Sequence, residues 1–379
     1  MGFYPGQTGQ TPNYRYNLIC ATAGKPINCS PQMHEAYRIS ADSLKLRGPA
    51  QEKFHRSAAE VARSKFGRHV FVRGVVEVSN YCRENCAYCG MRRDNQTLSR
   101  FRAHRDQLAE LLIHHRPASV TDVNIQAGED PVAVREIILP LLQTLRRETS
   151  LGLSVCLGTL NEALYDELKA AGATIYILKF EIADEQLYAQ MEAPGTFKER
   201  VEHIHLLAAK GWQVSSGFIA GLPGQAEQEM LGNFELARQL PLAGCSVSPF
   251  IPGEATPFAN APTGDIDVTL NCMAVLRLMR PDWVIPSVSA LNLAGPESGY
   301  RRGLRTGANL VTMNLTPSEI RGDYLLYKRD RFIMTEELIL SAIAAEGLAP
   351  SPQSLADFYR AKHVNGKPVR IKSAEPAVG

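Results

Sequence analysis

Short apolar segments rich in β-branched residues alternate with amphipathic segments from residue 73 of this 379-residue chain onward. The apolar segments predict strands, and the segments between them have the spacing of helices. Strands that alternate with helices form a parallel sheet, which is buried on both faces and therefore has continuous apolar runs. We predict strands at residues 73–79, 119–126, 152–157, 174–179, 213–219, 244–249, 283–288 and 309–314.

Eight such units within roughly 240 residues match the count and size of a (β/α)8 TIM-type barrel in the α/β class. An open, doubly wound sheet is the alternative, and the alternation alone does not separate the two folds. Two further helices, at 32–47 and 49–66, precede the first strand. The helices predicted within the repeat are 105–114, 133–148, 161–171, 197–210, 226–239, 268–279 and 296–306.

The chain is predicted to have four parts. An irregular N-terminal arm (1–30), rich in Gly, Pro, Asn, Gln and Thr, leads into N-terminal helices (31–70). The barrel and a C-terminal module follow (71–345), and a C-terminal helix and tail (346–379) end the chain. A hydrophobic content of 45% and a charged content of 21% are typical of a soluble globular protein.

Composition also limits the partners. No apolar run approaches the ~20 residues of a membrane-spanning helix. The net charge of +2 argues neither for nor against nucleic acid, and we predict neither a membrane nor a nucleic-acid partner. Eight cysteines without a secretory signal indicate a reducing environment, so a cytoplasmic location is expected.

Three cysteines follow the first predicted strand directly. Cys82, Cys86 and Cys89 have the spacing C-x3-C-x2-C, which lets their thiolates share one inorganic centre. A structural zinc normally takes four ligands, often as two separated pairs, and no second pair follows here. Each iron of a cubane iron–sulfur cluster takes a ligand from outside the cluster, so three cysteines would leave one iron open. A zinc site, a redox site, a disulfide and purely structural cysteines remain the alternatives.

The cysteine spacing, with Tyr88 before the last cysteine, resembles the signature of radical S-adenosylmethionine (SAM) enzymes. The flanking stretches 78–82 and 92–95 are similar to the branch that contains biotin synthase, methylornithine synthase and the radical SAM maturase of FeFe hydrogenase, closest to the last. The resemblance covers about residues 50–345, including a biotin-synthase-like C-terminal module. It implies a [4Fe–4S] cluster on the three cysteines, with SAM at the open iron and Tyr88 among the cofactor contacts.

Polar residues after the second predicted strand supply further cofactor contacts. Gly128, Glu129 and Asp130 form a glycine-containing acidic motif that the resemblance places at the methionyl amine of SAM. A glycine also allows close approach of the backbone to a ligand. The alternative for this motif is a solvated turn before the next helix.

Later strand ends carry the remaining candidates. The resemblance places Glu181 at the ribose or amino-acid part of SAM, and it implies that Arg200 pairs with the SAM carboxylate. An arginine suits that role because its guanidinium binds carboxylates in a bidentate manner, although Arg200 could instead be a surface partner within its helix. Ile219 and Gly221 lie in the segment that the resemblance places at the adenine.

The chain departs from biotin synthase at the ligands of the second cluster. Where biotin synthase has a cysteine on the fifth strand, this chain has Ser215, and the third strand has only Cys156. Sulfur insertion is therefore disfavoured unless Cys20 and Cys29 of the arm rebuild a second cluster. Cys156 and Cys245 are left open as either cavity-facing or buried thiols.

The resemblance implies an enzyme that reductively cleaves SAM and uses the 5′-deoxyadenosyl radical on a small molecule, in a hydrogenase-maturase-like reaction. A one-electron reductant of the ferredoxin or flavodoxin type is the implied partner. A carbon-skeleton mutase of the methylornithine synthase type and sulfur insertion of the biotin or lipoyl type remain open. A cluster-stabilised binding protein without enzymatic activity is a fourth possibility, and no residue is assigned a catalytic role from the sequence.

Overall fold

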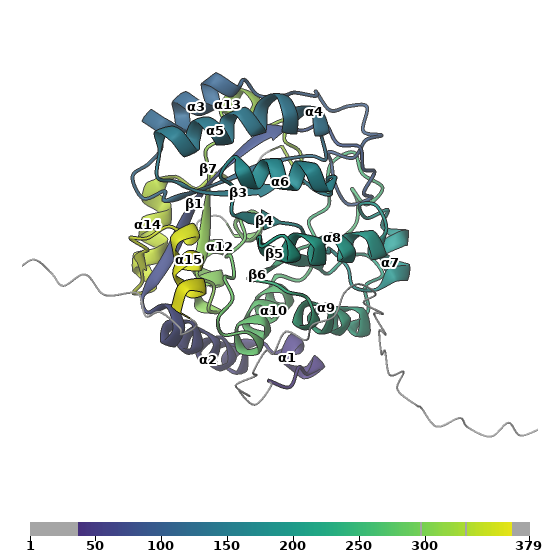
Figure 1. Cartoon of the computed structure of the whole chain (residues 1–379). Coiled ribbons are helices and arrows are strands. Elements are labelled where there is room, and N and C mark those ends of the chain that lie inside the picture. The colour runs from purple at the N-terminus through teal and green to yellow at the C-terminus, as the bar shows by residue number, and fades with distance from the viewer. Residues whose placement is uncertain (1–36, 296–297, 330–331, 366–379) are drawn as a thin grey trace, which may run out of the picture. The chain divides into compact units, whose positions relative to one another are not determined.

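The computed structural model describes residues 37–295, 298–329 and 332–365, and Figure 1 shows them as a curved sheet surrounded by helices. Within the described residues, seven regular strands follow the order β6-β5-β4-β3-β2-β1-β7, and neighbours in this order are parallel. The strands are β1 (His69–Ser79), β2 (Asp122–Ala127), β3 (Gly152–Cys156), β4 (Ile175–Ile177), β5 (Gln213–Ala220), β6 (Gly244–Pro249) and β7 (Leu310–Asn314).

The strand predicted at 283–288 is reduced to isolated bridges. Val284 forms a parallel bridge with Gly244 of β6, and Pro286 forms one with Leu310 of β7. The predicted TIM-type barrel is therefore confirmed in a partial form, in which single bridges replace a regular strand between β6 and β7 in the described part of the chain.

Helices lie on the outer face of the sheet, as Figure 1 shows for α5, α6, α8 and α9. The helix predicted at 133–148 is divided by a π-helical turn at Val134–Ile138. The first helix is α1 (Ala41–Lys45), and the remaining part of its predicted range that precedes residue 37 lies outside the described residues. The other helices are α2 (Gly48–Phe66), α3 (Arg105–His114), α4 (Pro131–Ala133), α5 (Leu139–Glu148), α6 (Glu162–Ala170), α7 (Glu185–Gln190), α8 (Phe197–Ala209), α9 (Glu227–Gln239), α10 (Ile266–Met279), α11 (Leu291–Ala294), α12 (Gly299–Arg305), α13 (Ser318–Arg321), α14 (Glu336–Ala345) and α15 (Leu355–Asn365).

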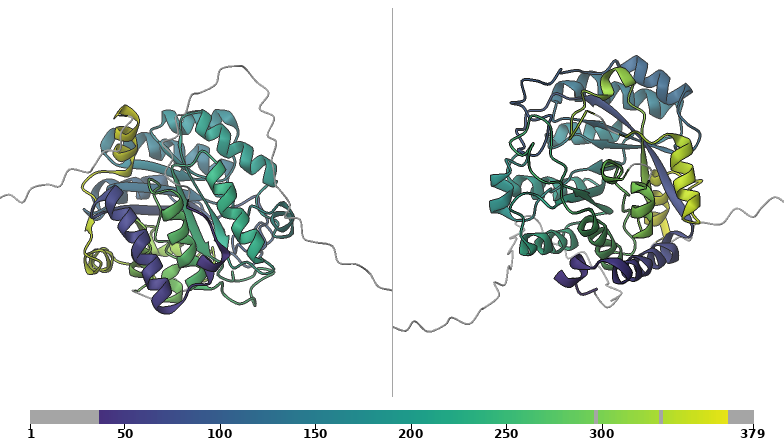
Figure 2. Two further views of the ribbon diagram at one scale, coloured as in Figure 1. Left: turned by 90° about the horizontal axis from the view of Figure 1, so that it is seen from below. Right: turned by 180° about the vertical axis from the view of Figure 1, so that it is seen from behind.

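The N-terminal ends of the strands are covered by helices from both ends of the described chain. Helix α2 packs against α10 and α12, as the two views of Figure 2 show. The ring of Phe358 in α15 lies 5.5 Å from those of Phe66 in α2 and Phe71 in β1. Asp122 at the start of β2 accepts the backbone N–H of Leu355 (2.8 Å), which fixes the first turn of α15. Strand β1 begins at His69 rather than at 73 because its first residues pair with β8 (Ala349–Pro350).

Arg277 of α10 stabilises the weak edge of the barrel. Its guanidinium is fully buried and donates to the carbonyls of Gly307 (2.8 Å), Pro281 (2.9 Å) and Trp283 (2.7 Å). It also donates to Oδ1 of Asn309 (2.9 Å), just before β7. These bonds connect the irregular bridging segment to the turn before β7, and so they replace the missing strand pairing.

No helix in the described residues is long and apolar enough to span a bilayer.

Replacing Arg277 by Met should lower the free energy of unfolding by about 3 kcal/mol or more, because several buried carbonyls lose their donor at roughly 1–3 kcal/mol each. Chemical denaturation followed by circular dichroism measures the change. Arg238→Met is the matched control, since Arg238 is a surface residue paired with Glu235, and it should cost less than about 1 kcal/mol. Equal effects of the two substitutions would contradict the role assigned to Arg277.

Candidate active site

A cavity of about 390 Å³ lies within the barrel and opens among the C-terminal ends of the strands. Its wall includes Cys82, Cys86 and Cys89, together with Glu129 and Arg200 from other parts of the chain. Active sites of TIM-type barrels lie at this end of the strands. The structure thus brings together residues that the sequence placed after different strands.

Residues 80–95 form the loop that carries the three cysteines. Side chains at its start and just after its end hold it in place. Asn80 is fully buried and donates to the carbonyl of Ser99 (2.7 Å) while its own Oδ1 accepts from the N–H of Phe101 (2.7 Å). Arg100 donates to the carbonyls of Asn80 (2.5 Å) and Met91 (2.9 Å). The loop conformation is therefore set by protein hydrogen bonds, and Arg100, which the sequence analysis missed, is central to it.

The three thiols of the loop face the cavity in their neutral form. Burial raises the pKa of Cys82 and Cys86, and it raises the pKa of Cys89 to about 12. Across the residues that the structure describes, no three His, Cys, Asp or Glu side chains converge closely enough for a single metal ion. A cubane cluster instead carries its cysteine ligands on separate iron atoms. Three thiols that line one cavity from a single loop fit such a cluster, whose positive charge would also displace their protons.

Glu129 connects the cysteine loop to the opposite wall. Its backbone N–H donates to the Sγ of Cys82 (3.4 Å). Its carboxylate is only 6% exposed and accepts from Arg200 (3.0 Å, Oε1) and from Arg83 (3.0 Å, Oε2). Burial disfavours a charged guanidinium, but Glu129 and Tyr188 together outweigh this effect and raise the pKa of Arg200. A buried carboxylate and a buried guanidinium therefore lie side by side at the end of the cavity where the three cysteines lie.

Two glycines make room for this arrangement. A Cβ on Gly128 would lie 2.2 Å from the carbonyl oxygen of Tyr81 and 2.9 Å from the Cβ of Cys82. Gly158, with a φ of +70°, faces the carboxylate of Glu129, and a Cβ there would lie 2.1 Å from its Cδ. Gly128 is therefore required for contact with the cysteine loop itself. The importance of Gly158 could not be seen without the fold.

Glu181 has a left-handed backbone, with a φ of 63°, which is uncommon outside glycine and asparagine. Its N–H donates to the carbonyl of Gly217 (3.0 Å), and its carbonyl accepts from the N–H of Ile219 (3.0 Å). The carboxylate pairs with Lys179 (2.8 Å). The conformation turns the chain at the end of β4 so that Glu181 and Lys179 both line the cavity.

The remaining predicted contacts divide into two groups. Tyr88, Gly128 and Ile219 line the cavity, whereas Asp130 and Gly221 do not. Asp130 caps α4 and accepts two bonds from Arg102 (2.7 and 3.0 Å) behind the wall. Gly221, with a φ of +83°, allows a tight turn that packs on Gly264. A cofactor contact from either residue stays a prediction.

Some buried polar atoms of the cavity wall have no hydrogen-bond partner within the described structure. They include the hydroxyl of Tyr88 and the Nε of Arg200. Buried polar groups are normally satisfied, so these two atoms indicate that a polar molecule completes the site. A zwitterionic amino acid such as the methionyl part of SAM has the donors and acceptors that Glu129, Arg200 and Tyr88 require.

The inner part of the cavity is also polar. Arg73 and Glu77 of β1, Cys156 of β3 and Lys179 after β4 line it, and Asn292 of α11 joins them. The sequence analysis did not single out Arg73, Lys179 or Asn292, because only the folded barrel shows which residues line its inside.

The other two barrel cysteines belong to the core. Cys245 and Cys272 are fully buried among apolar side chains and do not line the cavity. Of the thiols outside the cysteine loop in the described ranges, Cys156 is therefore the one that faces the cavity. Cys20 and Cys29 lie outside the described residues.

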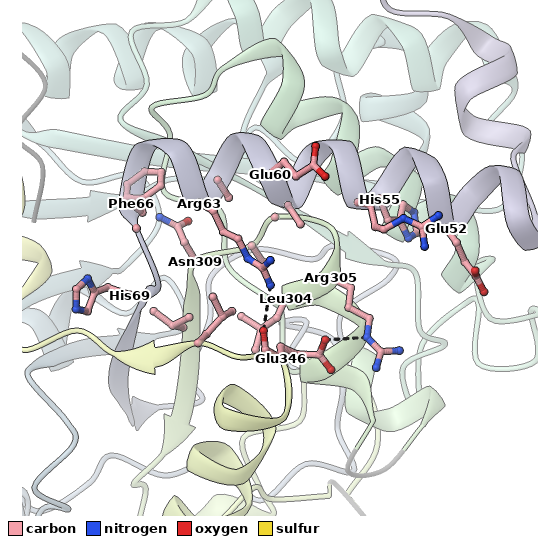
Figure 3. A pocket seen from close by; sticks show the side chains of 18 residues that line it. Glu52, His55, Glu60, Arg63, Phe66, His69, Leu304, Arg305, Asn309 and Glu346 are labelled. Atoms are coloured by element: carbon pink, nitrogen blue, oxygen red, sulfur yellow. Dashed lines mark hydrogen bonds and ion pairs between the residues drawn. The ribbon is translucent and has the colours of Figure 1, made fainter. Parts of the chain in front are cut away.

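A second hollow, of about 490 Å³, lies between α2 and α12 and is shown in Figure 3. Two of its arginines bond to Glu346: Arg305 donates to the carboxylate (2.9 Å), and Arg63 donates to the backbone carbonyl (3.1 Å). It lies beside His69 and Asn309, at the N-terminal ends of β1 and β7. Because this is the end opposite the cysteine loop, we assign the active site to the inner cavity despite the larger volume of the outer one.

Known proteins are similar to this chain in sequence and in fold. The model of the radical SAM superfamily matches residues 76–237. The [FeFe] hydrogenase maturase subunit HydE of Thermotoga maritima is 32% identical over 276 residues, which are 73% of this chain and 79% of that protein. The 3-methylornithine synthase of Methanosarcina acetivorans is 26% identical over 332 residues, 84% of this chain and 93% of that one. The crystal structure of methylornithine synthase (PylB) superposes with a TM-score of 0.76 at 24% identity, over 86% of this chain and 97% of that chain.

The cysteine loop, the inner cavity and these matches agree with one another. The matched range includes the three cysteines, Glu129, Glu181 and Arg200. The described fold is the partial barrel that the solved relative also has. The chain therefore belongs to the radical SAM superfamily, whose members are enzymes that use a [4Fe–4S] cluster and SAM.

Proposed function

We propose that this radical SAM enzyme holds its cluster with Cys82, Cys86 and Cys89 and acts on a small molecule in a hydrogenase-maturase-like reaction. The observation that carries the proposal is that the three thiols and the buried Glu129–Arg200 pair meet at one end of a single cavity. The 32% identity to a hydrogenase maturase subunit supports the reaction class. When bound, the reduced cluster and SAM supply a 5′-deoxyadenosyl radical, the reactive species of this chemistry.

The Glu129–Arg200 pair is suited to hold the amino-acid part of SAM. The Arg200 guanidinium would bind the carboxylate, and its unpartnered Nε is a free donor for it. The Glu129 carboxylate would accept from the amino group. Because both side chains are buried and already paired, they are held in place before SAM binds.

Other wall residues would contact the rest of SAM. Glu181, which has a left-handed backbone and lines the cavity, would contact the ribose or amino-acid part. The hydroxyl of Tyr88 lacks a partner and is a further polar contact. Ile219 provides an apolar surface for the adenine, and the turn at Gly221 supports the position of Ile219. Gly128 and Asp130 would act by holding the cysteine loop and the start of α4.

The inner part of this cavity is proposed to hold the substrate. Arg73 and Lys179 are cationic and Glu77 is acidic, so the wall suits a small polar or amino-acid-like molecule with charges of both signs. The helices that cover the N-terminal ends of the strands shield this space from water, which a radical intermediate requires.

A second candidate is a carbon-skeleton mutase of the methylornithine synthase type. The chain spans 93% of the curated 3-methylornithine synthase, which is the observation that favours it. Detection of 3-methylornithine by mass spectrometry in cells that express this protein, and its absence without the protein, would decide for the mutase.

Sulfur insertion has less support. Apart from the cysteine loop, the described residues place one thiol, Cys156, on the cavity wall. A second cluster needs several thiolates, and Cys245 and Cys272 are in the core. Membership of the superfamily also argues against a binding protein without enzymatic activity, since the relatives named above are enzymes.

SAM cleavage needs one electron for each radical. We propose a carrier of the ferredoxin or flavodoxin type as the donor and the cytoplasm as the location. The free thiols of the described cysteines agree with a reducing compartment. We propose no nucleic-acid partner.

Replacing Cys86 by Ala should abolish both the cluster and SAM cleavage, because two thiolates do not hold a cubane. Anaerobically reconstituted wild-type protein should contain about four irons per chain and release 5′-deoxyadenosine with dithionite and SAM. Cys245→Ala is the matched control and should keep both properties, since Cys245 lies in the core.

Iron and sulfide analysis and chromatography of the nucleoside make these measurements. Retention of cluster and cleavage in Cys86→Ala would remove the proposed ligand set. About eight irons per wild-type chain, falling to about four on substitution of Cys20 or Cys29, would revive sulfur insertion.

Arg200→Lys should raise the KM for SAM by about tenfold or more while leaving the iron content unchanged, because one bidentate donor next to a buried carboxylate is lost. Initial rates of 5′-deoxyadenosine formation at varied SAM concentration measure the effect. Arg135→Lys is the control, since Arg135 is a surface residue paired with Glu167. An unchanged KM in Arg200→Lys would show that this residue does not hold SAM.

A further inference from the structure

Cys156 is a thiol inside the barrel that the cluster does not need. It is the last residue of β3 and lines the cavity. In the strand register it lies opposite Gln126 of β2, which in turn lies opposite Glu77 of β1. Cys156 therefore lies on the cavity wall near the C-terminal ends of the strands. It comes just before Gly158, next to the end of the cavity where Glu129 and the three cysteines lie.

The chemistry of Cys156 differs from that of its polar neighbours. An S–H bond is much weaker than an O–H or N–H bond, so a carbon radical can take a hydrogen atom from it. Burial raises the pKa of Cys156 to about 11, against a smaller opposing effect of Lys179. The group is thus a protonated thiol at neutral pH, as a hydrogen-atom donor must be.

Independent observations indicate that the same space is suited to a polar ligand. Asn292 is 1% exposed, and its Oδ1 accepts from the N–H of Tyr300 (3.1 Å). Its Nδ2 and the Nε of Arg73 have no hydrogen-bond partner among the described residues, and both side chains line the cavity. Because buried donors are normally satisfied, a bound molecule with acceptor atoms is expected beside Cys156.

We propose that Cys156 donates a hydrogen atom to a carbon radical of the molecule bound in this inner cavity. This inference rests on the proposed function above. The Sγ–H bond breaks and a C–H bond forms, which leaves a thiyl radical on Cys156. One electron from the same class of one-electron carrier and one proton restore the thiol. Lys179, which follows the neighbouring strand β4, carries a proton on the same wall.

The proposal determines the fate of SAM. If the product radical takes its hydrogen atom from Cys156, the 5′-deoxyadenosine formed earlier does not give its hydrogen back. SAM is then a consumed co-substrate, and each turnover uses a second electron for the thiyl radical. Without a donor thiol, the nucleoside would be the source of that hydrogen and SAM could be regenerated.

The test uses no substrate, because the weakest exchangeable hydrogen in the cavity is then that of Cys156. Reconstituted protein is incubated with SAM and dithionite in D₂O, and the deuterium content of the 5′-deoxyadenosine is measured by mass spectrometry. Wild-type protein should give deuterated nucleoside. Cys156→Ser and Cys156→Ala should lose the deuterium, and Cys245→Ala and Cys272→Ala should retain it.

A second readout does not depend on turnover. The iron content and the circular dichroism spectra of Cys156→Ser and Cys156→Ala should equal those of the wild type, so that a loss of deuterium in these variants does not come from a loss of the cluster or of the fold. Undeuterated nucleoside from the wild type, or deuterium retained in both Cys156 variants, would overturn the inference. Absence of any 5′-deoxyadenosine would instead overturn the proposed function, and the inference with it.

Discussion

The buried carboxylate of Glu129 is the interaction on which the active site depends. Its backbone N–H bonds to the thiol of Cys82, and its side chain joins Arg83 of the cysteine loop to Arg200 of α8. Removing one partner from a buried charge pair costs roughly 3–5 kcal/mol. The contact therefore holds the cysteine loop, the end of β3 and α8 in one arrangement, and the two glycines that face it, Gly128 and Gly158, leave the space that it needs.

The rest of the barrel serves this arrangement. Asn80 and Arg100 set the cysteine loop, while α15 and Phe66 cover the opposite end of the strands. The bridged segment between β6 and β7 is the weak part of the sheet, and Arg277 compensates for it through carbonyls that no strand partner satisfies. A cavity that is open at one end and closed at the other follows from these contacts.

The alternation of apolar and amphipathic segments was sufficient to predict a parallel α/β sheet, and the count of eight units favoured a barrel over an open sheet. The short spacing of Cys82, Cys86 and Cys89 was sufficient to predict a shared centre. The meeting of Glu129 with Arg200 was expected only through resemblance, since 71 residues separate them. Arg100, Gly158 and Asn292 could not be identified, because their roles depend on neighbours distant in the chain. Asp130 and Gly221 do not line the cavity, and a cofactor contact from either residue stays a prediction.

The central claim is that the three cysteines leave one iron open and that SAM binds there beside Glu129 and Arg200. Electron–nuclear double resonance of the dithionite-reduced protein, with SAM labelled with ¹⁵N at its amino group, tests this most directly. A resolved ¹⁵N coupling to the cluster is expected, and in Arg200→Lys it should require about tenfold more SAM. A reduced cluster that shows no ¹⁵N coupling at saturating SAM would contradict it.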